Sequence, residues 1–453
     1  MKKILAGLLV ACMLTSMLVG CGAPKTEAPA TDEETTEAPA EEETPAEEEA
    51  PATEEAPAAD GEEVTLTFWT HIEDSWNVAQ DKIIAEFEAE NPNIKVKRES
   101  FPYDEFEAKT QTSLISKSGG ADIYELWGGW AVDFAPTGAF SPVPDDYVQH
   151  LVEDSYEPVL GAFKYEDKYY GVPWEFNIEY GGMLASIPLF EEIGAEYPTT
   201  WDEMIDAARK ATKGDGTTFD VRGIDFYSWD TLTYTWLSMI LSSGGQYMDG
   251  DTFAFDNPVA IETMQKLVDY VKVDKLTNID GLTNGGDSEP YQWFFQGEAL
   301  QVPRGPWAIS EGIHDYELEM GTDFDYIAMP FYGSEKKFAA ETGWGMAVNG
   351  SSAQQDAAWK FVEFWNEPDR MIEYNIACGM VPASKTSAQN PAFVEALPHM
   401  QPLVDILDGG QFIGLFNTDT LKEAVQDMVV DIVSNDTSVE DAVKGLDEHL
   451  NNG

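Results

Sequence analysis

Basic residues are scarce in this sequence. The chain has 26 Lys and Arg against 83 Asp and Glu, which gives a net charge of -57 at pH 7. A field of this sign repels nucleic acid and anionic lipid surfaces, so we expect no nucleic acid as a partner. The acids do not by themselves indicate a cationic ligand, because acidic residues spread along a whole chain are typical of a solvated surface.

Cysteine and catalytic signatures are also lacking. The cysteines are Cys12, Cys21 and Cys378, and two of them lie near the N-terminus, so the body of the chain has no pair for a disulfide and must be held by its core. The sequence contains no HExxH, GxSxG or P-loop motif, and its five histidines are scattered. The acids near residue 250 lack the spacing of a calcium loop. We expect no cofactor and no metal.

Long apolar runs are missing apart from one near the start. The chain begins with two basic residues, Lys2 and Lys3. The apolar run over 4–19 that follows them is too short for a stable membrane span. Leu18-Val19-Gly20-Cys21 follows and resembles the bacterial lipobox, which implies cleavage before Cys21 and a lipid on its sulfur. An ordinary signal peptide beside an incidental Cys is the alternative. We expect a signal peptide over 1–20 and a lipoprotein anchored to the outer face of the cell membrane.

Residues 21–63 carry the expected lipidated Cys21 and then almost no large apolar side chain. The segment consists mainly of Glu, Pro, Ala and Thr, which cannot bury enough surface to offset the entropy of ordering. We predict a disordered acidic tether that displays the following domain away from the membrane.

From Val64 onward, strand and helix patterns alternate. Residues 64–69 alternate as a strand, apolar residues between Trp76 and Phe87 follow at helical spacing, and residues 94–98 give the next strand. Similar alternation continues to the C-terminus, where the last eighty or so residues have mainly helical periodicity. We predict an α/β fold with open sheets, whose ligand crevice lies beyond the carboxyl ends of the strands.

The stretch over 168–182, KYYGVPWEFNIEYGG, combines flat rings with carboxylates and amides. Pro173 removes a backbone donor, which favours a sheet edge or a crossing point. Rings for stacking and carboxylates for hydroxyl groups suit a polyhydroxylated ligand, although a core strand with solvated acids on its other face has the same pattern.

Six short motifs in order make the body similar to a known family. They are FEAENP over 87–92, GADI over 120–123 with APTG over 135–138, KYYGVP over 168–173, PTTWDE over 198–203, FQGEA over 295–299 with GPW over 305–307, and GWGMA over 343–347. Together they resemble the extracellular solute-binding proteins of ABC importers, in the carbohydrate-binding branch that includes the maltose-binding protein.

The resemblance implies a two-lobed, type II periplasmic-binding-protein-like fold with hinge crossings. Lobe 1 would hold 64–174 with 328–371, and lobe 2 would hold 175–327 with 372–453. Carried onto this sequence, the ligand contacts of the family fall on Thr70, Glu73, Trp127, Trp130, Trp174, Glu175, Asn177, Trp307 and Trp344. The WGGW motif over 127–130 departs from the family by offering glycine and tryptophan where some relatives have charged side chains.

The implied function is capture, without catalysis, of a sugar that we expect to be an oligosaccharide. A monomer would close on the sugar between its lobes and deliver it to the permease subunits of an ABC importer. A polyamine or other cation bound by the same fold is the main alternative, because acids and rings also suit cations. Rings with paired carboxylates also describe a glycoside hydrolase. The ordered motifs argue against an enzyme.

Overall fold

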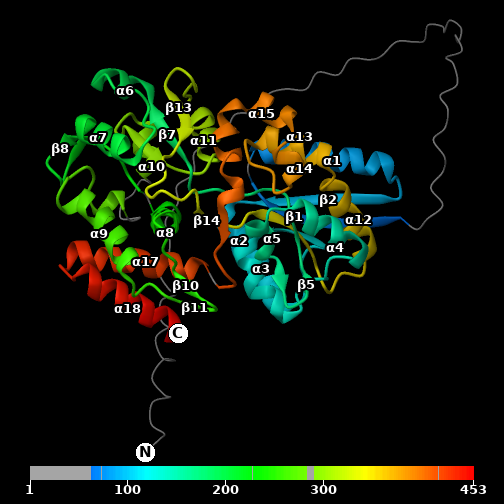
Figure 1. Ribbon diagram of the computed structural model, residues 1–453. Helices are drawn as coiled ribbons and strands as arrows, with labels where there is room; N and C mark the ends of the chain where they lie inside the picture. The colour runs from blue at the N-terminus through cyan, green and yellow to red at the C-terminus, as the bar shows by residue number, and fades with distance from the viewer. Residues whose placement is uncertain (1–62, 73, 227, 283–289, 417, 453) are drawn as a thin grey trace, which may run out of the picture. The chain divides into compact units, whose positions relative to one another are not determined.

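The computed structural model describes residues 63–72, 74–226, 228–282, 290–416 and 418–452. The expected signal peptide, Cys21 and nearly all of the expected tether lie outside these residues, as does Glu73. The described residues form two lobes, each with its own sheet and hydrophobic core, which together make one compact unit (Figure 1).

The sheet of the first lobe has the order β2-β1-β3-β15-β6. Its strands are β1 (Val64–His71), β2 (Ile94–Phe101), β3 (Ile123–Trp127), β6 (Val172–Pro173) and β15 (Trp344–Val348). β1 pairs in parallel with β2 and β3, whereas β15 runs antiparallel to β3 and β6. Pro173 therefore lies on the edge strand, where its missing N–H costs no ladder bond.

Helices and one hairpin complete the first lobe. They are α1 (Asp74–Glu90), α2 (Tyr103–Ser116), α3 (Gly128–Phe134), α4 (Asp145–Asp154), α12 (Gln355–Trp365), α13 (Pro368–Cys378) and the hairpin of β4 (Lys164–Tyr165) and β5 (Lys168–Tyr169). The core includes Phe68 of β1, Phe87 of α1 and Trp365 of α12, which are all fully buried. The short helix α5 (Glu157–Gly161) contributes Val159 to the core of the second lobe and Leu160 to that of the first.

The sheet of the second lobe has the order β12-β7-β13, with both neighbours antiparallel to β7 (Gly182–Ser186). The outer strands are β12 (Gln301–Pro303) and β13 (Phe324–Ala328), and β14 (Phe338–Ala340) pairs separately with β16 (Gly410–Phe412). Two further strand pairs form separate two-stranded sheets, β8 (Lys213–Gly214) with β9 (Phe219–Val221) and β10 (Met248–Asp249) with β11 (Thr252–Phe253).

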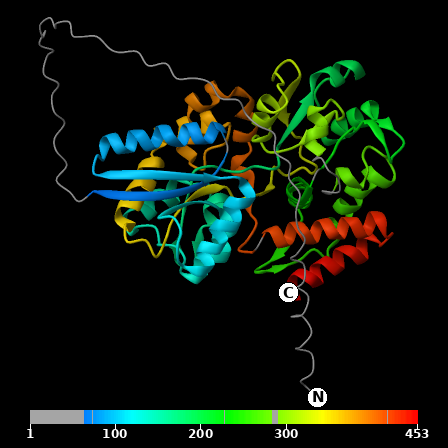
Figure 2. The same ribbon diagram turned by 180° about the vertical axis from the view of Figure 1, so that it is seen from behind.

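The helices around this second sheet are mostly short until the C-terminus. They are α6 (Ile187–Ile193), α7 (Trp201–Ala211), α8 (Thr233–Ser242), α9 (Pro258–Lys272), α10 (Pro290–Phe295), α11 (Ala308–His314), α14 (Lys385–Ala388), α15 (Pro391–Ala396), α16 (Gln401–Val404), α17 (Thr418–Ser434) and α18 (Val439–Asn452). α17 and α18 pack on α9 and run side by side in both views (Figures 1 and 2). Among the described helices, none has a stretch long and apolar enough to cross a membrane.

Local sequence explains where several of these helices begin. Thr200 caps α7 by accepting a hydrogen bond from the Glu203 N–H, and the Glu203 carboxylate accepts one from the Thr200 N–H, which together form a capping box. Asn257 accepts from the N–H groups of Val259 and Ala260 and so caps α9 ahead of its Pro258.

The chain passes between the lobes at three places. The first passage lies between Trp174, in the core of the first lobe, and Phe176, in that of the second. The second lies at 341–343 and not near 328 as expected, because β13 pairs with β7 and β14 with β16 in the second lobe. The third lies between Met380 and Val381 and not near 371, because α13 packs on α1 and continues the first lobe.

Candidate functional site

Aromatic rings line the side of the first lobe that meets the second. The His71 ring, at the end of β1, lies 5.0 Å between centroids from Trp344 and 5.8 Å from Tyr103. Trp344 also meets Trp130 edge-on at 5.6 Å. Trp344 is only partly buried, so part of its ring is available for contact.

The WGGW motif lies at the junction of β3 and α3. Gly128 begins α3, and Trp127 and Trp130 are buried at the start of that helix, with 7% and 4% of their surface exposed. A Cβ atom on Gly129 would overlap the Trp127 ring, so the glycine is what allows this ring to fold back onto the helix. Burial leaves both rings little free face for a ligand in this arrangement.

The buried ammonium of Lys422, on α17 of the second lobe, contacts residues of both lobes. Its Nζ lies 2.6 Å from the Asp230 carboxylate, 3.0 Å from that of Glu341 and 3.8 Å from that of Asp419. The same Nζ lies 4.7 Å from the centre of the Trp127 ring, which belongs to the first lobe. A cation over a ring face is attracted by the ring quadrupole, so Lys422 links carboxylates of one lobe to a ring of the other.

These charges shift one another's pKa values. Burial alone would lower the pKa of the Lys422 ammonium, but the Asp230 and Glu341 carboxylates outweigh it, and the pKa lies well above its usual value. Burial would raise the pKa of Asp230, yet Lys422 holds it below its usual value. Lys422 and Asp230 therefore remain charged at neutral pH.

Carboxylates also face one another across the lobes. Partial burial and the charge of Asp419, on the second lobe, raise the pKa values of Glu107 and Asp133, on the first. Like charges brought together in this way favour the binding of protons or of a cationic group.

Trp307 follows β12 and packs against both hydrophobic cores. Its indole Nε1–H donates to Glu179 Oε1 at 2.7 Å, and the Arg304 guanidinium lies 4.4 Å from the ring centre. Glu179 also accepts from the Gly305 N–H at 3.2 Å. These contacts fix the orientation of the Trp307 ring while leaving it only partly buried.

Two predicted residues of the first passage lie at the junction of the lobes. The Asn177 side chain is partly buried, and its Nδ2–H donates to Glu341 Oε2 at 2.5 Å. Glu175 is fully buried, with neither carboxylate oxygen exposed. Burial, followed by the charges of Glu125, Glu341 and Glu179, raises its pKa well above the usual value.

The structure places two other predicted residues away from any surface. Trp174 is fully buried and stacks on Trp365 with 5.3 Å between ring centres, because its side chain points back into the core of the first lobe. The Thr70 hydroxyl is also buried and shares a 2.7 Å hydrogen bond with Ser100. In this arrangement both residues serve packing, which is the more ordinary role of such residues.

Sequence reasoning missed Lys422, Asp230 and Glu341. A usable signal exists for Lys422, which directly follows Leu421 on the apolar stripe of α17, where a basic residue needs a buried partner. Asp230 lies in a π-helical turn over Ser228–Leu232 and Glu341 lies between β14 and β15, and neither has such a signal in a chain rich in acids.

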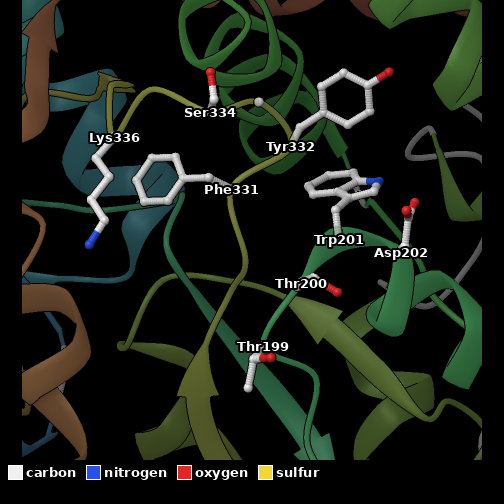
Figure 3. A pocket seen from close by; sticks show the side chains of 9 residues that line it. Thr199, Thr200, Trp201, Asp202, Phe331, Tyr332, Ser334 and Lys336 are labelled. Carbon is white, nitrogen blue, oxygen red and sulfur yellow. The ribbon is translucent and has the colours of Figure 1, made fainter.

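A separate hollow of about 390 Å³ lies on the second lobe beside the start of α7 (Figure 3). It is lined by Thr199, Thr200, Trp201, Asp202, Phe331, Tyr332, Gly333, Ser334 and Lys336. In Figure 3 the Trp201 and Tyr332 rings stand close together, with Lys336 at the other end. The residues predicted from the sequence to bind ligand do not contribute to its lining.

Comparison with known proteins finds solute-binding proteins in both sequence and structure. A "Multiple sugar-binding protein" of Streptococcus mutans is 25% identical over 309 residues, which cover 65% of this chain and 69% of that protein. Maltose-bound MalE3 of T. maritima superposes with a TM-score of 0.70 at 22% identity, over 85% of this chain and 99% of that one. A substrate-binding protein of Listeria monocytogenes in complex with cycloalternan superposes with a TM-score of 0.69 at 20% identity, over 86% of this chain and 98% of that one.

The structural likenesses establish the two-lobed fold, and the sequence relative is named as a sugar-binding protein. The bacterial extracellular solute-binding protein family matches residues 74–371, which is more than half of the chain. This chain belongs to the bacterial extracellular solute-binding protein family.

Proposed function

We propose that this protein captures a sugar between its lobes and delivers it to an ABC importer. The main observation behind this proposal is the contact of Lys422 with Trp127 across the lobes. The same ammonium is paired with the carboxylates of Asp230 and Glu341. An ammonium donates to hydroxyl groups, carboxylates accept from them, and nearby rings cover the apolar faces of a sugar. Relatives that bind sugars support the same ligand class.

The proposed contact residues are those that the interlobe arrangement leaves partly accessible. They are Trp307 and Trp344 for stacking and Asn177 for hydroxyl groups. Lys422 and Glu341 are buried in this arrangement and would reach hydroxyl groups only after the lobes separate. Trp127 and Trp130 would join them if the lobes separate before the sugar enters. The number of rings favours an oligosaccharide over a single sugar, since each ring face covers about one pyranose.

A cationic ligand is the second candidate, and the facing acids Glu107, Asp133 and Asp419 are the observation that favours it. A polyamine would offset the repulsion among these carboxylates directly, whereas a neutral sugar would not.

Thermal unfolding of the full chain with mono- and oligosaccharides, polyamines and amino acids separates these candidates. A ligand at a hundred times its Kd stabilises by about 2.7 kcal/mol, which raises the Tm measurably. We expect one sugar series to raise the Tm and to be recovered intact. A shift with polyamines alone would overturn the sugar proposal, and recovery of cleaved sugar would overturn the binding role.

We further propose that the mature protein is held on the outer face of the cell membrane through a lipid on Cys21 and acts as a monomer. The lipobox-like sequence before Cys21 supports the anchor. The permease subunits of the importer would then contact the outer faces of both lobes.

A further inference from the structure

The three passages between the lobes meet around the backbone of Glu175. The Glu175 N–H donates to the Trp344 carbonyl beside the second passage at 3.4 Å, and its backbone forms an antiparallel bridge with Pro382 of the third. The next N–H, that of Phe176, donates to the Val381 carbonyl at 2.7 Å. Any rotation of one lobe against the other must therefore move the surroundings of Glu175.

Four glutamates are buried around this junction, and three of them have partners. Glu125 accepts from the His71 N–H at 2.9 Å, Glu179 accepts from Trp307, and Glu341 accepts from Asn177 and Lys422. Glu175 differs, because neither of its carboxylate oxygens has a hydrogen-bond partner among the described residues.

The carboxylates that face Glu175 favour its neutral form, and they are those of Glu125 on β3, Glu179 after the first passage and Glu341 at the second. The Trp344 backbone acts in the opposite direction and lowers the pKa of Glu175, but burial outweighs it. The Tyr374 phenol on α13 also lies near Glu175. The nearby cations are already paired, Lys422 with Glu341 and Arg304 with Glu179. An ionised carboxylate without a partner is costly in such a site, so the group binds a proton instead.

We propose that Glu175 is a proton-linked hinge residue, whose carboxyl is neutral while the lobes are closed and ionises when they separate. Closed here means the arrangement in which Lys422 contacts Trp127 across the lobes. The proposal depends on lobe motion and not on which solute binds, so it can fail while the sugar proposal stands.

The direction of the effect follows from linkage. Burial raises the pKa of Glu175 in the closed form above its value in the open form, so the closed form binds the extra proton. Below the usual glutamate pKa of about 4.3, Glu175 is protonated in both the open and the closed form, so closure requires no proton uptake. As pH rises above that value, the closed-to-open ratio falls by up to about tenfold per pH unit.

The test is the distance between spin labels on the two lobes without added ligand. Ser118→Cys and Asp251→Cys place labels at exposed positions on the first and second lobes, in a full chain whose native cysteines are replaced by serine. We expect a short distance at a pH of about 5 and a growing longer population towards a pH of about 8. Glu175→Gln, which mimics the neutral acid, should keep the short distance at both values.

The control is Glu191→Gln, an exposed glutamate of α6, which should respond to pH as the parent does. Glu175→Leu provides a second non-titrating variant if the amide disturbs folding. A parent distance that does not change with pH would overturn the proposal. So would a pH response that survives in either Glu175 variant, because another group, such as His71, would then carry it.

Discussion

Side chains at the junction of the lobes act in pairs. The Trp307 ring is oriented by Glu179, and the charge of Lys422 is balanced by the Asp230 and Glu341 carboxylates. Because each pair is largely buried, removing one partner affects the other as well as any ligand.

At this scale, Trp307→Ala should weaken binding of the sugar that most stabilises the protein by about five- to thirtyfold, because a ring face on a sugar contributes about 1 to 2 kcal/mol. Isothermal titration calorimetry measures this loss. The matched control is Trp293→Ala, a partly buried tryptophan that packs under Arg222 on the second lobe. Equal affinities of parent and Trp307→Ala would exclude Trp307 from the site.

Lys422→Met should lower the free energy of unfolding by about 3 kcal/mol or more at neutral pH, because it leaves buried carboxylates without their cation. The loss should shrink as pH falls through about 8, the value to which burial raises the pKa of Glu341, because this acid then becomes neutral. Urea unfolding at several pH values measures both effects. Lys444→Met, an exposed change on α18, is the control, and a Lys422→Met protein as stable as this control would contradict the account.

At the scale of elements, the passages between the lobes are packed closely. Gly343 of the second passage lies against the backbone of Glu175 in the first, and a Cβ atom at this position would overlap the Glu175 carbonyl oxygen. The close approach needs glycine for its missing side chain.

Gly343→Ala should therefore force the passages apart and destabilise the protein by about 1 to 3 kcal/mol, the usual cost of overpacking. Differential scanning calorimetry measures the change. Gly445→Ala on α18 is the matched control, because a Cβ atom there meets open space and alanine favours a helix. If both variants have the parent Tm, the passages are not constrained as described.

At the scale of the whole molecule, the binding body begins at Val64 with β1, after the expected anchor and tether. An anchored binding protein stays near its importer, so anchoring raises its local concentration there.

Cys21→Ala should release the protein from the membrane fraction into the medium, because the lipid would have no sulfur to join. Fractionation of cells that express the full chain measures this, with Cys12→Ala as the control that keeps the anchor. Continued sedimentation of the Cys21→Ala protein with membranes would refute lipidation.

The sequence by itself determined the class of fold and several of its elements, because hydrophobic periodicity, capping residues and prolines act over a few residues. The apolar period of α1, the capping box at Thr200 and the edge position of Pro173 all follow from local chemistry. Ordered motifs likewise identified the family that the comparisons show.

Only the tertiary structure decided which rings and acids reach the junction of the lobes. No local sequence pattern distinguishes Trp174 from Trp307. Trp174 nevertheless stacks on Trp365 in the core of the first lobe, whereas Trp307 packs between the two cores. Lys422 and Glu341 are 81 residues apart and become a pair only when the second passage meets α17. The physical reason is that burial and charge pairing depend on contacts between distant segments, which no local pattern specifies.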